Sequence, residues 1–405
     1  MKRHLKQTVI AIAFSGVASA MFANAASIEP VDGLNVNQPF YQPEAFVIQK
    51  QAPVVDLTGI PVELHGQRIM SQAGKEVELF LANARRKFEV IGLDPIEMSI
   101  ELTEVFKNSK KLNPEFIGTL ESLAQELGID ARELFALSQT DYAVVKLMEK
   151  GKKTEVKPGG CTSMAFNSSG VVGQTNDLAS LDYGSGIILK KDQSITTMTG
   201  FGPAGQSLGK RVGVVINFLG ADTQGMDVSD SMATGMGALV DALAKTRSVE
   251  EAVELLTTNR TIVGMNFTIA DIDGNAASVE VGRDGLLVTI GEKGVAHANH
   301  SLREGSEESF RANLGGNFKE QTIASSYSFW RQEAAETFLK HTPEIDVDAM
   351  KYIFNQKPIA QSAAYGSDFI TVNTVVLDTQ SGCMNYAPGI GDWTGYQQVC
   401  FNSQH

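Results

Sequence analysis

The chain reads Gly159-Gly160-Cys161-Thr162-Ser163 near its middle, and Gly173-Gln174-Thr175-Asn176-Asp177 follows shortly afterwards. A cysteine that directly follows two glycines and enters a β-rich segment is what a chain needs if it cuts itself there and exposes that cysteine as a new N-terminus. Glycines suit this step because residues without a Cβ tolerate a distorted backbone. The alternative is a buried, inert cysteine, and the rest of the sequence has to decide between the two.

The residues before Cys161 form the clearest internal boundary in the chain. Residues 151–160 are polar and contain lysines, glycines and Pro158. Such a composition is typical of an exposed, flexible linker. The sequence therefore predicts a helical N-terminal segment over residues 26–160 and a second part over residues 161–405 that begins with the cysteine.

The cysteine count bears on the reactivity of Cys161. The chain has three cysteines, and Cys383 and Cys400 lie close together near the C-terminal end. A disulfide between these two would close a loop of a size that stabilises a fold by roughly 3 kcal/mol. Cys161 is then left over, and an unpaired thiol in an exported chain indicates reactivity.

Export is predicted by the first residues. Lys2, Arg3 and Lys6 precede an apolar run, and a stretch of small residues ends it near Ala25. This order is typical of a secretory signal peptide over residues 1–25, with cleavage after Ala20 as an alternative, and the run is too short to favour a membrane anchor. We expect a secreted or periplasmic protein.

The charge excludes two classes of partner. The formal net charge is −13, and it becomes −16 when the three positive charges of the signal peptide are removed. So acidic a surface repels nucleic acid and anionic lipid, and no basic tract offsets it. We expect neither a nucleic-acid nor a membrane partner, and the sequence leaves a homo-oligomer open.

Helical periodicity dominates the part before Cys161, after an irregular arm over residues 26–55 that contains four prolines. Apolar residues recur at helical spacing among charged ones, and Asn113 and Asp130 are placed as N-caps. The predicted helices are Gly74–Val90, Pro95–Lys107, Pro114–Leu127 and Ala131–Leu147.

Short β-like runs dominate the part after Cys161. Two helices interrupt them, one opened by the capping box at Ser248 and running to Asn259, and one over Trp330–Lys340. Helices in blocks and strands in blocks favour an α+β fold with largely antiparallel sheets. The predicted strands are Thr162–Phe166, Val171–Gln174, Gly186–Lys190, Ser194–Thr199, Arg211–Phe218, Thr261–Ala270, Ala277–Val281, Leu286–Ile290, Thr371–Asp378 and Met384–Ala387.

Several motifs point to other functions and are weaker than they look. Residues 200–205 match the dinucleotide-binding pattern G-x-G-x-x-G. However, a strand instead of a helix follows, and Pro203 removes a backbone N–H that such a loop would offer, so we expect a loop near the mouth of the active site and no nucleotide site. Asp271, Asp273 and Asn275 resemble a calcium loop, yet Ala276 stands where that loop needs glycine, so a hairpin turn is expected.

The remaining candidates for metal or serine chemistry are also weak. His297 and His300 could share a metal, but no third ligand of similar spacing accompanies them, so we expect histidines beside a pocket. No G-x-S-x-G elbow supports a serine hydrolase. If the chain is an enzyme, Cys161 is its candidate nucleophile.

The stretches quoted at the start carry a family resemblance. Gly160-Cys161-Thr162 with Gly173-Gln174-x-Asn176-Asp177 resembles the penicillin acyltransferase family of N-terminal-nucleophile hydrolases, also called acyl-coenzyme A:6-aminopenicillanate acyltransferases or C45 peptidases. More distantly, it is similar to choloylglycine hydrolases. The resemblance covers most of residues 60–390 and continues through Val62–Gln67, Arg211–Asn217, Ser248–Leu256, Ile269–Gly274 with Val279-Glu280, His297–His300, Thr371–Asp378 and Ala387–Gly389.

The resemblance implies a fold and a reaction. The fold would be an αββα sandwich of two antiparallel sheets between helical layers. The Cys161 thiol would attack the Gly160 carbonyl, and hydrolysis of the resulting ester would leave two chains. The new α-amine, with a reference pKa of about 7.7–8.0, would then serve as the base for its own thiol. The mature enzyme would hydrolyse a linear amide C–N bond, or transfer its acyl group, through an S-acyl intermediate on Cys161.

The resemblance also assigns roles to individual residues. Asp177 would hold the α-amine, and Gln174 stands where choloylglycine hydrolases carry an arginine. Asn299, and less directly Asn217, would donate to the oxyanion of the tetrahedral intermediate. No metal or organic cofactor is implied, and coenzyme A would be a co-substrate only if the chain is an acyltransferase.

One departure from the family pattern motivates a rival hypothesis. Many relatives carry an arginine where Ser328 stands, and Arg331 follows three residues later. Either Arg331 substitutes or the network is altered. The rival is therefore a catalytically impaired binding or regulatory protein on the same fold. The small-molecule amide that would be the substrate is left open, as is the choice between hydrolysis and transfer.

Overall fold

The computed structural model describes residues 51–149, 160–199, 202–219, 227–282, 285–306, 318–343, 345–361 and 369–401. The predicted signal peptide, the arm up to residue 50 and linker residues 151–159 lie outside these ranges. Among the described helices, none combines the length and the apolar character needed to cross a bilayer.

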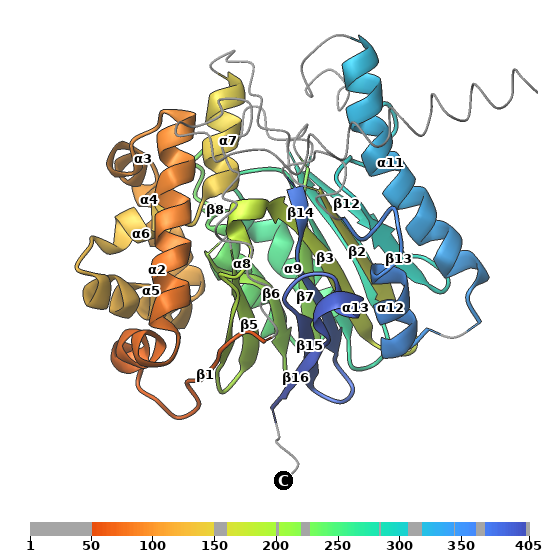
Figure 1. Ribbon diagram of the computed structural model, residues 1–405, viewed down its shortest axis with the longest axis horizontal. Helices are drawn as coiled ribbons and strands as arrows, with labels where there is room; N and C mark the ends of the chain where they lie inside the picture. The colour runs from red at the N-terminus through yellow and green to blue at the C-terminus, as the bar shows by residue number, and fades with distance from the viewer. Residues whose placement is uncertain are drawn as a thin grey trace, which may run out of the picture. The chain divides into compact units, whose positions relative to one another are not determined.

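Two β-sheets form the centre of the described part (Figure 1). The first sheet, sheet A, has the strand order β1-β4-β5-β6-β7-β10-β11-β12. Neighbouring strands within it are antiparallel, except that β1 runs parallel to β4. Its strands are β1 (Val54–Asp56), β4 (Ile187–Lys190), β5 (Ser194–Thr199), β6 (Gly202–Gly209), β7 (Val212–Phe218), β10 (Met265–Asp271), β11 (Ala276–Gly282) and β12 (Gly285–Thr289).

The second sheet, sheet B, is antiparallel throughout, with the order β13-β2-β3-β14-β15-β16. A short parallel pair, β8 (Ala233–Thr234) with β9 (Arg260–Thr261), lies apart from both sheets in the hydrogen-bonding pattern. The strands of sheet B are β13 (Gly294–His297), β2 (Gly160–Phe166), β3 (Val171–Ala179), β14 (Phe369–Asp378), β15 (Cys383–Ala387) and β16 (Gln397–Cys400).

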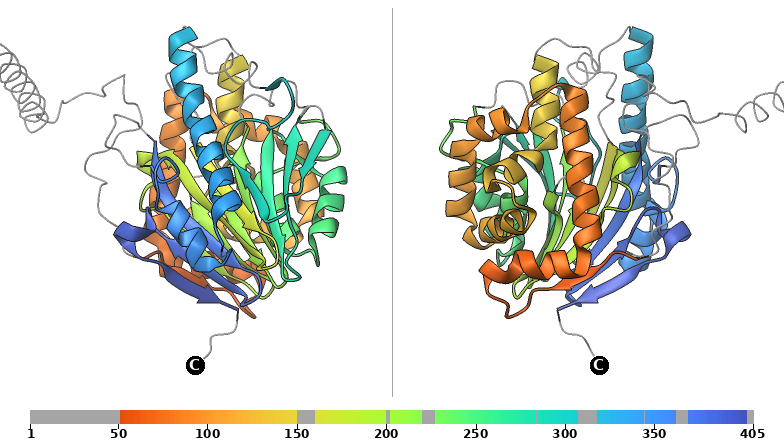
Figure 2. Two further views of the ribbon diagram at one scale, coloured as in Figure 1. Left: turned by 90° about the vertical axis from the view of Figure 1, so that its right-hand side faces the viewer. Right: turned by 60° about the vertical axis from the view of Figure 1, so that its left-hand side comes forward.

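Helices cover the outer face of each sheet, as Figures 1 and 2 show. α8 (Met236–Ala244) and α9 (Val249–Thr258) pack on sheet A, with the N-terminal helices beyond them, whereas α11 (Phe318–His341) and α12 (Val347–Phe354) pack on sheet B. β2 and β3 contact β7 and β10 across the space between the sheets. This αββα arrangement confirms the predicted fold class.

The N-terminal helices share a hydrophobic core with the part that follows Cys161. Val77 and Phe80 of α2 belong to the same buried cluster as Leu239 of α8 and Val214 of β7. The side-chain amide of Gln397 on β16 also forms two hydrogen bonds to the backbone of Ala52, at 2.7 and 3.0 Å. Buried apolar area of this kind holds segments together without a covalent link.

The predicted helices are confirmed in position and corrected in length. α5 (Pro114–Leu127) has the predicted bounds, and Asn113 caps it. α2 (His65–Ile91) begins earlier than predicted, since buried His65 is bonded to Thr119 and Ile60, and a kink at Ala73 precedes the predicted start. The other two predicted helices each split, into α3 (Pro95–Glu101) and α4 (Thr103–Leu112), and into α6 (Ala131–Leu137) and α7 (Thr140–Glu149).

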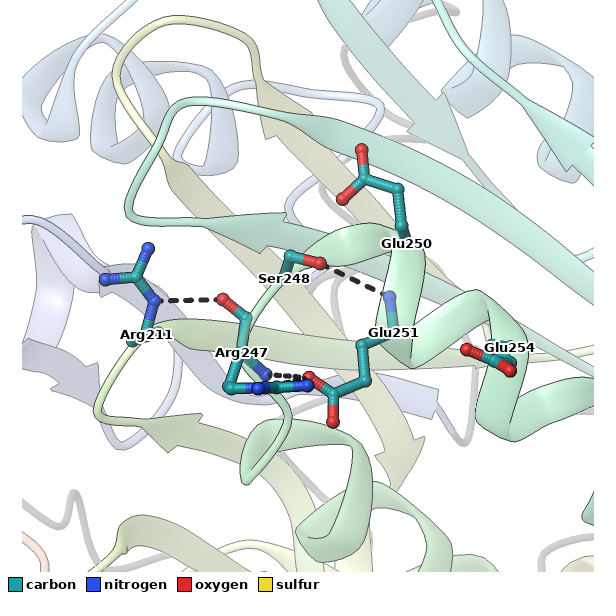
Figure 3. Close-up of a pocket in the computed structure, with 6 residues that line it drawn as sticks. All are labelled: Arg211, Arg247, Ser248, Glu250, Glu251 and Glu254. Atoms are coloured by element: carbon teal, nitrogen blue, oxygen red, sulfur yellow. Dashed lines mark hydrogen bonds and ion pairs between the residues drawn. The ribbon is translucent and has the colours of Figure 1, made fainter.

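The capping box of α9 is present, with one partner changed. The Ser248 Oγ accepts a hydrogen bond from the Glu251 backbone N–H at 3.3 Å (Figure 3). The Glu251 carboxylate, however, accepts from the backbone N–H and the guanidinium of Arg247, both at 2.9 Å. The turn at Asp271 is the expected hairpin, because its Oδ1 accepts the backbone N–H groups of Asp273 and Asn275.

One expectation for this part is wrong. The glycine-rich residues 202–205 do not form a loop, because they open strand β6, which pairs with β5 and β7. Its last residue, Gly209, lies under α8, since a Cβ there would come within 1.7 Å of the Ala244 carbonyl oxygen. Glycine therefore lets the helix approach the sheet closely. The elements that were not predicted from the sequence are α8, α12, α13 (Gly391–Thr394), β1, β8, β13 and β16.

The predicted disulfide between Cys383 and Cys400 is present and joins cross-strand partners of β15 and β16. Replacing both cysteines by alanine is expected to lower the free energy of unfolding by about 3 kcal/mol, because the unfolded chain gains the freedom of the opened loop. Denaturant unfolding of the double variant and of the reduced wild type should give the same lowered midpoint. An unchanged midpoint in both would show that the bridge contributes nothing.

Candidate active site

Cys161 lies where the two opening stretches of sequence meet. β2 and β3 pair as antiparallel neighbours, with Cys161 opposite Asn176 and Gly160 opposite Asp177. The hairpin therefore places the predicted cleavage site directly beside the Asn176-Asp177 pair. Cys161 is the free cysteine, and 3% of its surface is exposed.

Burial controls the protonation of the Cys161 thiol. Burial, with smaller contributions from the nearby Asp177 and Asp141 carboxyls, raises the pKa of this thiol to about 12, while the Asp177 backbone N–H and Arg331 act in the opposite direction. The Sγ lies 3.4 Å from Asn176 Oδ1, to which it can donate. The thiol of the uncut chain is therefore protonated at neutral pH and needs a base to react.

Asp177 is a buried carboxyl that titrates near neutral pH. Burial raises its pKa to about 7, against the lowering effects of Arg331 and of a hydrogen bond from Thr371. That bond, from Thr371 Oγ1 to Asp177 Oδ1, measures 2.6 Å. The other oxygen, Oδ2, is buried and has no hydrogen-bond partner among the described residues. A carboxyl with such a pKa can both accept and return a proton at pH 7.

Asn299 contacts the nitrogen of Cys161. Its Oδ1 accepts the Cys161 backbone N–H at 2.7 Å and an Arg331 Nη2–H at 2.8 Å. Its Nδ2 donates to the Phe218 carbonyl at 3.0 Å. The side chain therefore meets the cysteine through its acceptor in this uncut chain, and its role as an oxyanion donor stays a prediction.

Arg331 of α11 reaches the same site, with 2% of its surface exposed. Its Nη1 donates to the Cys161 carbonyl oxygen and, at 3.0 Å, to Thr162 Oγ1. Ser328, three residues earlier, accepts the Asn299 backbone N–H at 3.0 Å and lies 2.8 Å from His300 Nδ1. The guanidinium thus lies at the cysteine, while the serine supports the loop that carries Asn299.

The other two predicted amides lie deeper between the sheets. Asn217 Oδ1 accepts from Ser163 Oγ at 2.5 Å, and its Nδ2 donates to the His297 carbonyl at 3.2 Å. Gln174 donates to the Ile216 carbonyl and accepts from Gln206 Nε2, the latter at 3.0 Å. Within the described part of the chain, neither side chain hydrogen-bonds to Cys161.

Glu280 organises the histidine-bearing loop and was missed as a site residue, although it stands in a stretch that carries the family resemblance. Its Oε1 accepts from His297 Nε2 at 3.0 Å and from the Leu302 N–H at 2.6 Å, while Oε2 accepts from Ser301 Oγ at 2.5 Å. Burial opposes ionisation, but these bonds hold the pKa of Glu280 below its usual value. This buried anion fixes both ends of the loop that carries Asn299.

The two histidines differ in environment. Burial, His297 and Arg331 lower the pKa of His300 to about 3, so its ring is neutral at pH 7. His297 is bonded to Glu280 on one side and lies 3.0 Å from the Ala298 carbonyl oxygen on the other. The described ranges contain no group of three or more His, Cys, Asp or Glu side chains placed to hold a metal.

A surface depression at the start of α9 is no rival site. Both arginines that line it already have partners, since Arg247 pairs with Glu251 and Arg211 donates to the Arg247 carbonyl, as Figure 3 shows. Arg211 also pairs with Asp273 at 2.5 Å. These groups lack the buried, unsatisfied polar atoms that surround Cys161.

Comparison with known proteins gives one family. The sequence model of acyl-coenzyme A:6-aminopenicillanic acid acyl-transferase matches residues 163–387, more than half of the chain. The match begins two residues after Cys161, so it includes Asp177, Asn299 and Arg331 but not Cys161, the predicted nucleophile. No curated protein sequence matches this chain.

The solved structures that match include two kinds of enzyme. Two variants of conjugated bile acid hydrolase from Clostridium perfringens are 13% and 14% identical, with TM-scores of 0.42 and 0.43, and each match covers 60% of this chain and 93% of that chain. Penicillin V acylase from Agrobacterium tumefaciens is 10% identical, with a TM-score of 0.35 over 56% of this chain and 82% of that chain. From the family match, the chain belongs to the acyl-coenzyme A:6-aminopenicillanic acid acyl-transferase family.

Proposed function

We propose that this chain is a self-processing cysteine N-terminal-nucleophile enzyme that acts on a linear amide C–N bond. The observation that carries the proposal is the setting of the Gly160–Cys161 bond. Asn299 accepts the Cys161 N–H at 2.7 Å, and Asp177, with a pKa of about 7, lies opposite Gly160 on the neighbouring strand. Family membership supports acyl-group chemistry, and the choice between hydrolysis and transfer is part of what has to be tested.

The first reaction is cleavage between Gly160 and Cys161. The Sγ adds to the Gly160 carbonyl carbon, the C–N bond breaks, and a thioester forms between Gly160 and the Cys161 side chain. The Asp177 carboxylate takes the thiol proton and returns it to the departing nitrogen. Water then hydrolyses the thioester, which leaves a Gly160 carboxylate and a Cys161 with a free thiol and a free α-amine.

The second reaction uses that new N-terminus. An α-amine has a pKa of about 7.7–8.0, so near neutral pH it can take the proton of its own thiol and pass it to the leaving amine of the substrate. Asn299 Oδ1, which already accepts the N–H of this nitrogen, orients the amine, and Asp177 adds a second acceptor. The acyl group moves from the substrate nitrogen to Sγ, and water or an acceptor amine then removes it.

We also propose that the protein is exported and that its mature form consists of two chains. A signal peptide over residues 1–25 would direct the chain out of the cytoplasm, and cleavage would give pieces over residues 26–160 and 161–405. The shared core of α2, α8 and β7, together with the place of β1 in sheet A, would hold the pieces together after the cut.

Intact-mass measurement of the purified wild-type chain tests this proposal. Two masses that meet at the Gly160–Cys161 bond are expected, and a panel of chromogenic amides should add an acyl mass to the piece that begins with Cys161. A single mass, equal to that of a chain still joined between Gly160 and Cys161, would contradict the self-processing mechanism. A cut protein that gains no acyl mass from any amide would instead favour the binding or regulatory protein.

A further inference from the structure

Gln361 was not singled out by the sequence, yet it lies against the predicted cleavage site. It follows α12 and precedes β14, and its side chain is buried, with 6% exposed. The backbone fixes it there, because its N–H donates to Thr371 Oγ1 at 2.9 Å and its carbonyl accepts from the Thr371 N–H at 3.1 Å. Thr371 in turn donates to Asp177, so Gln361 belongs to the same hydrogen-bonded chain as the candidate base.

The Gln361 amide faces Gly160. A Cβ placed on Gly160 would come within 2.9 Å of Gln361 Nε2 and within 2.9 Å of Arg331 Nη2. Two N–H-bearing groups therefore lie against the residue whose carbonyl carbon is attacked in self-cleavage. The contact also explains why this position is a glycine, since a side chain would displace both groups.

The two groups, Arg331 Nη2 and Gln361 Nε2, differ in their hydrogen bonds in the uncut chain. Arg331 Nη2 donates to Asn299 Oδ1. Gln361 Nε2 is buried and has no hydrogen-bond acceptor anywhere in the described ranges. An unsatisfied buried amide costs about 1–3 kcal/mol, so a folded chain retains few of them without a reason.

We propose, on the basis of the self-cleavage proposed above, that Gln361 is a further catalytic residue of that step and that its Nε2–H donates to the Gly160 oxygen. When Sγ bonds to the carbonyl carbon, the π electrons of the C=O bond move to this oxygen and it becomes an oxyanion. The donor stabilises the charge until the C–N bond breaks and the carbonyl re-forms. A donor without a partner before the attack and with one during it accelerates the reaction, because it binds the transition state and not the ground state.

The test compares cleavage rates of newly made chains. Cell-free translation followed by a time course of the two pieces gives the rate for the wild type, Gln361→Leu and Gln361→Glu. Leucine removes the donor without leaving a cavity, and glutamate keeps the shape but offers only acceptors when ionised. We expect both variants to cut about 10²–10³-fold more slowly, the effect of losing one oxyanion donor.

Gln139→Leu is the matched control. Gln139 is also 6% exposed and its amide donates to Ser138 Oγ at 2.8 Å, between α6 and α7. This variant should cut at the wild-type rate. Folding is compared by thermal unfolding of each variant in the Cys161→Ala background, where every chain stays uncut, and Gln361→Glu decides if Gln361→Leu fails to fold.

The outcomes separate this inference from the function on which it rests. Wild-type cleavage with slow cutting in folded Gln361 variants supports both. Wild-type cleavage with Gln361 variants that cut at the same rate overturns the role of Gln361 and leaves the self-processing mechanism standing. A wild-type chain that is never cut would overturn both the self-processing mechanism and the role of Gln361 in it.

Discussion

Cys161→Ala is expected to yield a single chain that never separates at Gly160 and has no amidase activity. Alanine removes the only group proposed to attack either carbonyl, so both reactions should fall by roughly 10⁴-fold or more, as when a nucleophile is removed from other acyl-transferring enzymes. Intact mass reports the cleavage, and release of a chromogenic amine reports the turnover. The two losses should appear together because one sulfur atom serves both reactions.

Cys161→Ser is the matched variant for this prediction. It keeps a nucleophile of similar size, with a hydroxyl in place of the thiol, so slow but measurable cleavage is expected. Both variants should unfold at closely similar temperatures, because the polar contacts of Cys161 Sγ, with Asn176 Oδ1 at 3.4 Å and with the Asp177 backbone N–H, are weak. Cleavage of the alanine variant at the wild-type position would show that another group, or a contaminating protease, cuts the chain.

The parts of the site that the sequence predicted are those whose residues stand in a recognisable local order. Cys161 and Asp177 were placed together because their two stretches match one motif, and the structure makes them neighbours on a β-hairpin. Asn299 was assigned by resemblance, and it contacts the cysteine nitrogen. The doubt over Arg331 could not be resolved from sequence spacing, because only the path of α11 decides whether position 328 or 331 faces the cysteine.

The parts that the sequence did not predict depend on tertiary contacts. Gln361 lies in a connection between two elements, where no periodicity marks a buried side chain. Glu280 stands in a strand, and the sequence alone does not tell whether its carboxylate faces the interior or the surface. Only its partners at β13 and on the loop that follows reveal its role. Residues 202–205, at the start of β6, were predicted to be part of a loop. Glycine and proline disfavour strands, but pairing with β5 and β7 and the close approach of α8 outweigh that preference.

Arg331 ties the elements of the site together. Its guanidinium donates to the carbonyl of Cys161 and to Thr162, both on β2, and to Asn299, on the loop that follows β13. Its charge also lowers the pKa values of both the Cys161 thiol and the Asp177 carboxyl, opposing the effect of burial. One side chain therefore acts on both geometry and protonation, and two substitutions can separate the two effects.

Arg331→Met is expected to slow cleavage by about 10²–10³-fold and to move its pH dependence upward. Three acceptors each lose one donor, and a buried group left unpaired costs about 1–3 kcal/mol. Loss of the positive charge raises the pKa of Asp177 above its value of about 7, so the carboxylate needed as a base appears only at higher pH. The pKa of the Cys161 thiol rises in the same direction, so both groups shift the profile the same way.

Arg331→Lys separates charge from geometry. Lysine keeps the positive charge but cannot reproduce the planar fork that reaches several acceptors at once, so cleavage should be slow while the pH profile stays close to that of the wild type. Arg247→Met, which removes an exposed arginine paired with Glu251, controls for the change in net charge and should leave rate and profile unchanged. A normal rate in folded Arg331→Met would contradict both roles, because neither the bonds nor the charge of this side chain would then matter to the reaction.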